Sequence, residues 1–254
     1  MENLFSIKNK VVIITGAGRG IGFHLASNMA KHFANVYGID VKFPEKIPKN
    51  LSSRLNQIRC DITNYKKFQN VCKKIFSKHN RIDVLVNNAG VSYASQKRGQ
   101  LFSQKNWIKT INVNLTGSFY CSQAVIEYML KKKNGSIINI TSINAELGFP
   151  RNPAYNASKG GLKMLGKAFA KDWSRFGIRV NNIGPGYIKT KMTAKRFTNK
   201  KTMLERQNQT LLGRWGDADD LVGPCIFLAS DASKYITGQD IYVDGGWLAN
   251  SGIT

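Results

Sequence analysis

The sequence predicts an α/β fold: one doubly wound, mostly parallel sheet of about seven strands, with helices on both faces. Two observations point to this class. Short apolar runs alternate regularly with longer segments of helical spacing, and several runs are apolar throughout, as strands covered on both faces should be. Such alternation favours right-handed crossovers between neighbouring strands. The chain has 254 residues and is 42% hydrophobic. That composition suits one domain, residues 1–254, with an ample core.

Each element has a local justification. Residues 10–15 form an apolar run that ends at a glycine, and residues 20–33 follow with helical spacing. The further strands are expected at 35–40, 55–60, 82–86, 136–140, 178–182 and 239–243. The further helices are expected at 64–78, 107–130, 153–176 and 217–229. Thr63 or Asn64 and, later, Asp217 are suitable N-caps for two of these helices.

One segment, residues 189–212, fits neither pattern. It is polar, basic and long enough to form a mobile lid over a substrate. We found no linker, repeat or second domain elsewhere in the chain.

The charge balance is strongly basic, with 38 Lys and Arg against 15 Asp and Glu, a net charge of +23. Such a field attracts nucleic acid, anionic membranes or anionic small molecules. The basic runs are short, however, and no aromatic residues are interleaved with them to stack on bases. We therefore expect solvated lysines that reflect a compositional bias, with an anionic substrate as the second interpretation. No specific nucleic-acid partner is expected, and a basic nucleic-acid-binding module is the rival from another functional class.

Other classes of site receive little support. No run of about twenty apolar residues occurs, so no membrane span is expected. Residues 1–9 have no apolar core of a signal peptide. The four cysteines lack paired spacing and the three histidines are not clustered with acids. These features predict a cytoplasmic protein with reduced, buried thiols and no metal centre.

A glycine-rich loop follows the first expected strand directly and opens the first expected helix. It contains Gly16, Gly18, Arg19, Gly20, Ile21 and Gly22. Glycines let the backbone approach a pyrophosphate, which the free N–H groups and dipole of the helix N-terminus favour. The spacing differs from the usual G-x-G-x-x-G, but its strand-loop-helix context predicts a Rossmann-type dinucleotide site.

Asp40 ends the second expected strand, where an acid can accept hydrogen bonds from the adenosine ribose. A carboxylate there also repels a 2′-phosphate, so Asp40 predicts NAD as the preferred cofactor. Arg19 and Lys42 favour NADP instead, because a nearby cation could bind the extra phosphate. NADP therefore stays open as an alternative.

Tyr155 and Lys159 are four residues apart in an expected helix, so their side chains share one face. A tyrosine has a pKa of roughly 10 and is a poor base at neutral pH, but a neighbouring ammonium lowers that pKa. A phenol tuned in this way can exchange a proton with a carbonyl or alcohol oxygen.

Together with further motifs, these residues resemble the short-chain dehydrogenases/reductases over essentially the whole chain. The motifs occur in the family's order: the glycine loop, Asp61, Asn87-Asn88-Ala89-Gly90, Asn114, Ser142, Tyr155-x-x-x-Lys159 and Pro185-Gly186. The resemblance implies a hydride transfer between a secondary alcohol or ketone and a nicotinamide, without a metal.

The resemblance also implies roles for individual residues. Tyr155 would be the acid/base, Lys159 would hold the nicotinamide ribose and lower the tyrosine pKa, and Ser142 would bind the reacting oxygen. Asn114 would hold a water that links Lys159 to solvent. The remaining cofactor contacts would come from Asp61, Ile62, Asn88, Ala89, Gly90, Pro185, Gly186, Ile188 and Thr190.

The expected substrate pocket is polar. It would be formed by Ser142, Tyr155, Asn144, Glu146 and Tyr187, with Ser92, Tyr93, Asn152 and the lid around them. Residues 142–148, 186–193 and 214–217 are similar to the sugar-acid and polyol dehydrogenases of the family, gluconate 5-dehydrogenase among them. Lys189, Lys191, Lys195 and Arg196 would suit a carboxylate.

Two further expectations depend on the resemblance. A 3-oxoacyl-carrier-protein reductase is the rival enzyme, although its usual NADPH conflicts with Asp40. Family members of this length are usually tetramers that pack the helices near 107–130 and 153–176 and the last strand against other subunits. The substrate's identity and stereochemistry, and the direction of the reaction, do not follow from the sequence.

Overall fold

The structure is a computed structural model that describes residues 3–95, 101–194 and 198–250. Within these residues, seven strands form one sheet in the order β3-β2-β1-β4-β5-β6-β7, and all neighbouring strands are parallel. The strands are β1 (Val11–Thr15), β2 (Asn35–Asp40), β3 (Leu55–Arg59), β4 (Val84–Asn87), β5 (Gly135–Ile140), β6 (Ile178–Pro185) and β7 (Asp240–Val243). The predicted fold class is confirmed. The strand order reverses between β1 and β4, and ligands of such sheets bind at the carboxyl ends beside that point.

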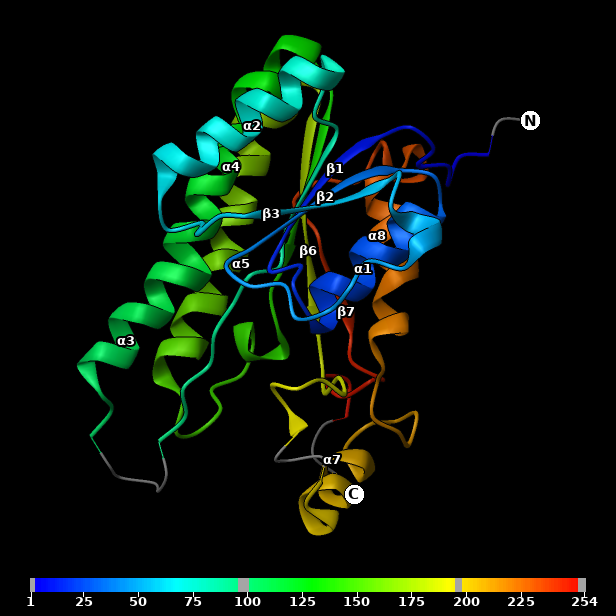
Figure 1. The fold of residues 1–254 in the computed structure, drawn as a ribbon. Helices are drawn as coiled ribbons and strands as arrows, with labels where there is room; N and C mark the ends of the chain where they lie inside the picture. Colours follow the sequence, from blue (N-terminus) through cyan, green and yellow to red (C-terminus); the bar gives the residue numbers. More distant parts are fainter. Residues whose placement is uncertain (1–2, 96–100, 195–197, 251–254) are drawn as a thin grey trace.

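Helices cover both faces of the sheet (Figure 1). Helices α1 (Gly20–Lys31) and α8 (Val222–Ala229) lie on one face, and α2 (Tyr65–His79), α4 (Gly117–Lys132) and α5 (Pro153–Trp173) lie on the other. No described helix is both long and apolar enough to cross a membrane.

The structure differs from the sequence expectation in two helical segments. The long helix expected at 107–130 is α3 (Gln104–Ile111) joined to α4 through a π-helical turn, Asn112–Thr116. Within the segment 189–212, where no element was expected, α7 (Lys200–Asn208) forms and lies beyond the ends of the strands (Figure 1).

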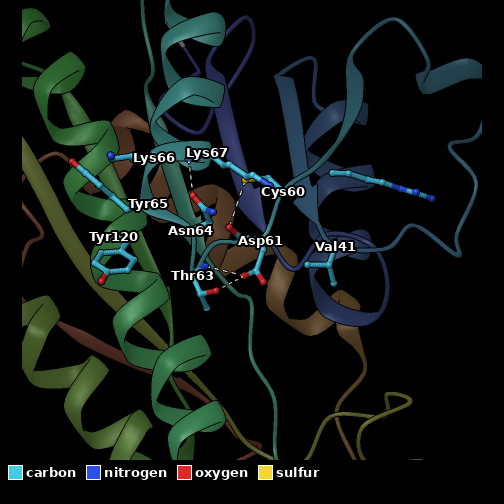
Figure 2. A pocket seen from close by; sticks show the side chains of 10 residues that line it. Val41, Cys60, Asp61, Thr63, Asn64, Tyr65, Lys66, Lys67 and Tyr120 are labelled. Carbon is cyan, nitrogen blue, oxygen red and sulfur yellow. Dashed lines mark hydrogen bonds between the residues drawn. The ribbon is translucent and has the colours of Figure 1, made fainter.

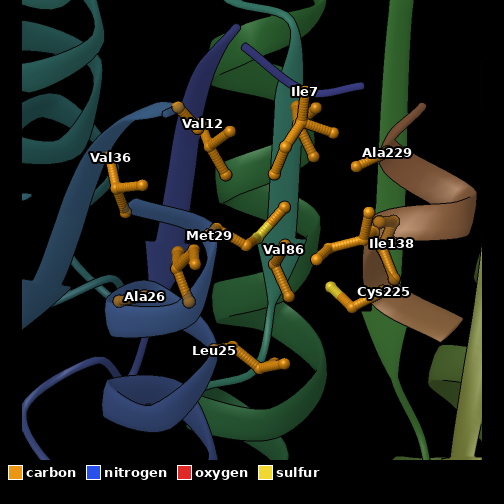
Figure 3. Packing of buried hydrophobic residues seen from close by; sticks show 14 of the residues in the cluster. Ile7, Val12, Leu25, Ala26, Met29, Val36, Val86, Ile138, Cys225 and Ala229 are labelled. Atoms are coloured by element: carbon orange, nitrogen blue, oxygen red, sulfur yellow. The ribbon is translucent and has the colours of Figure 1, made fainter. Parts of the chain in front are cut away.

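The core is divided by the sheet into two apolar layers. On β1, Val12 and Ile14 point into the layer under α1 and α8, whereas Val11 and Ile13 point into the layer under α2, α4 and α5. This alternation is the period of two that a strand imposes. Figure 3 shows the first layer, with Met29 of α1 and Cys225 of α8 packed near Val86 and Ile138.

A row of three buried amides and one half-buried carboxylate also crosses the sheet, at positions that are in register on four strands. Asn87 Nδ2 donates to Asn139 Oδ1 at 2.9 Å, and Asn139 Nδ2 donates to Asn182 Oδ1 at 2.9 Å. Asn182 Nδ2 then donates to Asp240 Oδ1 at 2.7 Å. We call these four residues the amide ladder. It lies under α5, where a Cβ on Gly166 would be 2.4 Å from Asn182 Oδ1.

Candidate active site

The glycine loop joins β1 to α1 and leaves room for an anion. Gly16 and Gly20 have positive φ angles of 66° and 58°, which suit glycine. No side chain in the described part of the chain caps the N-terminus of α1, and a Cβ on Gly20 would meet no atom within 4 Å. The free N–H groups and dipole of α1 therefore face open space, so this loop fits the pyrophosphate of a dinucleotide.

Asp40 is tied to this loop by its carboxylate. Its Oδ2 accepts the N–H of Gly18 at 2.8 Å, and its Oδ1 accepts the N–H of Val41 at 2.7 Å. Arg19, which follows Gly18, and Lys42, two residues after Asp40, are both exposed. The expected ribose position thus has one engaged carboxylate and two solvent-exposed cations.

Asp61 lines a cavity of about 740 Å³ next to Val41, Arg59, Tyr65 and Tyr120 (Figure 2). Its Oδ1 accepts from the N–H and hydroxyl of Thr63, at 2.9 and 2.8 Å. Ile62 is buried, and its side chain fills the space opposite Gly117 of α4, where a Cβ would approach within 2.7 Å.

The turn after β4 is fastened to the glycine loop. Asn88 Nδ2 donates to the carbonyls of Thr15 and Gly16 at 2.9 and 3.2 Å. The N–H groups of Asn88 and Ala89 both donate to Thr15 Oγ1 at 3.1 Å. Gly90 faces Asn114, whose Oδ1 would be 3.5 Å from an added Cβ. The structure therefore brings the predicted residues 88–90 and the glycine loop together.

Asn114 is fully buried in the π-helical turn between α3 and α4. Its Nδ2 donates to Val91 O and Ser158 Oγ, both at 3.0 Å, and its Oδ1 accepts the N–H of Val91 at 2.8 Å. Single π turns are frequent at functional sites. The side chain joins the turn after β4 to α5, two elements that hold predicted site residues.

Tyr155 and Lys159 lie on α5 as the spacing predicted, with Lys159 Nζ 5.6 Å from the centre of the Tyr155 ring. Lys159 is 3% exposed, and its Nζ donates to Ile140 O, the last residue of β5, at 2.6 Å. Burial lowers the pKa of this ammonium to about 8. A cation within about 6 Å of an aromatic ring stabilises the negative charge that a tyrosinate develops.

Ser142 follows β5 and opens the turn Ile143–Ala145. Its Oγ donates to Asn144 Oδ1 and accepts the N–H of Asn144, both at 3.1 Å. Asn144 Nδ2 in turn donates at 2.7 Å to Oδ1 of Asn156, the residue that follows Tyr155 in the sequence. Asn144, predicted to touch substrate, thus holds the Ser142 hydroxyl against α5 in this structure.

Glu146, another predicted substrate residue, is engaged elsewhere. Its carboxylate accepts from Lys163 of α5 and from the Tyr242 hydroxyl of β7. Hydrogen bonds from Lys163 and then Tyr242 lower the pKa of Glu146, while burial and the bond to Glu146 raise the pKa of Tyr242. This cluster fastens the turn that begins at Ser142 to β7.

The segment after β6 forms the opposite wall. Gly186, next to Pro185, donates its N–H to Val243 O at 3.0 Å, and Ile188 bridges to Gly216. The N–H of Thr190 donates to Thr193 Oγ1 at 3.0 Å. Tyr187 is buried against Trp215, Trp247 and Ile143, the residue that follows Ser142.

The lysines predicted to meet a carboxylate pair with acids. Lys189 lies 3.4 Å from Asp217, and Lys191 lies 3.2 Å from Glu45. Lys195 and Arg196 lie outside the described residues. Arg206 of α7, which sequence reasoning missed, instead places its guanidinium carbon 5.2 Å from the centre of the Tyr187 ring. Its segment has no periodic pattern, so no local signal identified it.

The four cysteines are buried, and in the described ranges no three His, Cys, Asp or Glu side chains are grouped to hold a metal ion. The pKa of Cys225 is raised to about 12 by burial, so this thiol is not a nucleophile.

A glycine loop at a helix N-terminus, with a tyrosine, a buried lysine and a serine at the carboxyl ends of the strands, is the arrangement expected of an oxidoreductase that acts on CH–OH groups with NAD(P). Comparison with known proteins agrees. A family model of short-chain dehydrogenases, described as "Enoyl-(Acyl carrier protein) reductase", matches residues 16–248. The chain belongs to the short-chain dehydrogenase/reductase family.

Similar proteins include a 2-dehydro-3-deoxy-D-gluconate 5-dehydrogenase of Bacillus subtilis, 35% identical over 253 residues and 98% of each chain. A 3-oxoacyl-[acyl-carrier-protein] reductase of Thermotoga maritima is 36% identical over 248 residues, 94% of this chain and 98% of the relative. A crystal structure of a gluconate 5-dehydrogenase from Burkholderia cenocepacia, in complex with NADP and tartrate, superposes with a TM-score of 0.89. It is 33% identical and the match covers 97% of this chain and 98% of that one.

Proposed function

We propose that this protein interconverts a secondary hydroxyl and a ketone on a sugar acid, with NAD(P) as the hydride acceptor or donor. The observation that carries the proposal is the buried Lys159 ammonium beside the Tyr155 ring, at the carboxyl end of β5. The substrate class is supported by the relatives named for gluconate derivatives and by the tartrate, a hydroxy acid, named for the Burkholderia structure.

The residue roles implied by the resemblance form part of this proposal. In the oxidation direction the Tyr155 phenolate takes the proton of the substrate's hydroxyl group. The carbon that carries this hydroxyl gives up a hydride, which a nicotinamide bound there would accept. Lys159 stabilises the phenolate by its charge. Ser142 hydrogen-bonds the reacting oxygen, which requires its hydroxyl to turn from Asn144. Asn114 holds the water through which Lys159 regains its proton from solvent. The hydrogen bonds of Asn114 to Val91 and Ser158 fix the position of the Asn114 side chain.

The cofactor would be held by the predicted set from the glycine loop to Thr190. The preference for NAD predicted from Asp40 is not supported, because the similar Burkholderia enzyme is a complex with NADP. We propose that NADP is accepted. The carboxylate of Asp40 is turned to the N–H of Gly18, and Arg19 and Lys42 are exposed for a 2′-phosphate. Initial rates with NAD⁺ and NADP⁺ test this point, and an absolute requirement for NAD⁺ would contradict it.

We also propose that residues 189–212 form a lid over the substrate and that residues 1–254 form a single domain. We propose further that the protein is cytoplasmic and a homotetramer. Exposed apolar side chains on α4 and α5, among them Phe119, Leu130 and Met164, support the packing of these helices on other subunits. Sedimentation would reveal a monomer of 28.3 kDa if the assembly is wrong.

A 3-oxoacyl-carrier-protein reductase is the second candidate, since one such relative is 36% identical. The deciding experiment is a screen of NAD⁺ and NADP⁺ reduction over sugar acids, polyols and 3-hydroxyacyl thioesters. Higher kcat/KM on a thioester than on every sugar acid would favour the reductase.

The Tyr155→Phe variant tests the chemistry. Removing the phenolic oxygen should lower kcat at least about a hundredfold, the usual contribution of a general acid/base. Cofactor affinity should stay within about threefold, because the ring still packs beside Lys159. A Tyr155→Phe enzyme with wild-type turnover would show that another group moves the proton.

A further inference from the structure

Three buried polar atoms, on residues that contact Tyr187 or open the helix of Tyr155, have no hydrogen-bond partner among the described residues. They are Asn152 Oδ1, Arg206 Nε and Trp247 Nε1. An unmade hydrogen bond in a buried position costs about 1–3 kcal/mol, so each such atom calls for an explanation. Their chemistry is specific: one acceptor and two N–H donors, of which one is cationic.

The two donors belong to side chains that contact the same ring. The Arg206 guanidinium carbon lies 5.2 Å from the centre of the Tyr187 ring, and the Trp247 ring centre lies 6.0 Å from it. Trp247 also packs on Phe149, at 5.3 Å between ring centres. Trp215, the other tryptophan on Tyr187, differs because its Nε1 donates to Met203 O at 3.0 Å. Of these two tryptophans, therefore, Trp247 is the one whose indole N–H has no hydrogen-bond partner among the described residues.

Arg206 has an unbalanced charge. Its Nη1 donates to the neutral Gln209 Oε1 at 2.8 Å, and it forms no ion pair within the described ranges. Arg214, six residues from the end of α7, makes a bidentate pair with Asp220. Asp244, the nearest acid in sequence to Trp247, accepts the N–H groups of Gly246 and Leu248 at 2.9 Å. Arg206 therefore combines a buried N–H with a charge that no acid of the described residues neutralises.

This group of side chains adjoins the proposed reaction centre. Ile143, next to Ser142, belongs to the same buried cluster as Tyr187 and Trp215, with Phe149 and Trp247 packed against it. Asn152 is 5% exposed, donates to Ser92 Oγ at 2.6 Å, and precedes Tyr155 by three residues at the start of α5.

We propose that Arg206 and Trp247 form the subsite for the substrate's carboxylate, with Asn152 accepting a hydrogen bond from one of its hydroxyl groups. A carboxylate accepts from two N–H groups at once, and a charged donor makes the bond stronger. The inference depends on the proposed sugar-acid function and deepens it. It replaces the lid lysines, which pair with Asp217 and Glu45, as the groups that recognise the anion.

The test compares gluconate with glucitol, in which CH₂OH replaces the carboxylate. In Arg206→Met, kcat/KM for gluconate should fall about tenfold to a hundredfold, the range for a lost charged hydrogen bond. The value for glucitol and the KM for the cofactor should change less than about threefold. Trp247→Phe should show a smaller loss of the same kind. Lys74→Met, an exposed residue of α2 outside the proposed lid, loses the same charge and is the control; it should leave the values for both substrates unchanged.

The outcomes separate this inference from the proposed function. Equal losses on gluconate and glucitol, or no loss on either, would overturn the carboxylate subsite while sugar-acid turnover stands. No turnover of any sugar acid by the wild type would overturn the proposed function. In that case gluconate is tested as an inhibitor against whichever alcohol is turned over, and the subsite stands only if Arg206→Met weakens that inhibition at least about tenfold.

Discussion

Replacing Lys159 by Met should abolish turnover and yet make the protein more stable at neutral pH. Burial lowers the pKa of Lys159 from its ordinary value of 10.5 to about 8. At about 1.4 kcal/mol for each pH unit, the buried ammonium costs the native state about 3 kcal/mol. Met removes the charge but leaves Ile140 O without the Lys159 donor, at a cost of about 1–2 kcal/mol. The net gain should be about 1–2 kcal/mol.

The pH dependence of this gain has a fixed sign. Because the pKa is lower in the folded state, the unfolded chain binds more protons between pH 8 and 10.5. The destabilisation by Lys159 is therefore complete below about pH 8 and disappears as the pH rises towards 10.5. The advantage of the Met variant should follow the same course.

Calorimetric melting without cofactor measures the effect. For a chain of this size the gain corresponds to a rise in Tm of about 2–8 °C at pH 7, which falls to zero or slightly below near pH 10. Lys171→Met, on the exposed side of α5, is the matched control and should shift Tm by no more than about 2 °C, by the same amount at both pH values. The reasoning is refuted if Lys159→Met melts at or below the wild type at pH 7, or keeps the same advantage at both pH values.

Three glycine substitutions give further predictions. A Cβ on Gly18 would lie 2.0 Å from Lys42 O, so Gly18→Ala should displace the glycine loop. NADP⁺ binding, measured by fluorescence titration, should weaken at least about tenfold. Unchanged affinity would show that the loop is not the cofactor site. On α5, Gly166→Ala would place a Cβ 2.4 Å from Asn182 Oδ1 and should cost about 1–3 kcal/mol of unfolding free energy. Gly160→Ala on the same helix meets no atom within 4 Å and should gain up to about 1 kcal/mol. Urea denaturation of both variants checks the pair, and equal effects would contradict the close packing at Gly166.

The strands and most helices could be predicted from the sequence because their patterns are local. Residues 11–15 alternate between two apolar layers, and Asn64 caps α2 by accepting the N–H of Lys67, as expected. The π turn at Asn112–Thr116 and the helix α7 were missed. A π turn depends on how Asn114 bonds to Val91 and Ser158, and α7 depends on packing by Met203 and Arg206; neither contact leaves a periodic signal in the chain.

The sequence predicted which helices and strands hold the candidate site residues, but it did not predict which side chains those residues bind. The i, i+4 spacing placed Tyr155 and Lys159 correctly because helix geometry fixes it. The pairings of Glu146 with Lys163 and Tyr242, and of Lys189 with Asp217, join residues distant in the sequence. With 38 basic residues and only 15 acids in the chain, most cations must lack an acid, so composition could not identify the one that lies against Tyr187. The fold singles out Arg206 by its buried Nε and by its position against the Tyr187 ring.

The amide ladder explains how α5, with Tyr155 and Lys159, keeps its position along the helix axis relative to the strands. Apolar packing alone would tolerate a shift of α5 by one turn, about 5.4 Å, because apolar residues recur on its buried face. Such a shift would place Leu162 or Ala170 where Gly166 now lies, and their Cβ atoms would collide with the Asn139 and Asn182 amides. It would also break the bond from Asn182 Nδ2 to Lys163 O, at 3.1 Å, and the bond from Lys159 to Ile140 O. Buried amides left without partners cost about 1–3 kcal/mol each. Polar pairing across the sheet therefore fixes the register of α5, and with it the distance between Tyr155 and the carboxyl ends of the strands.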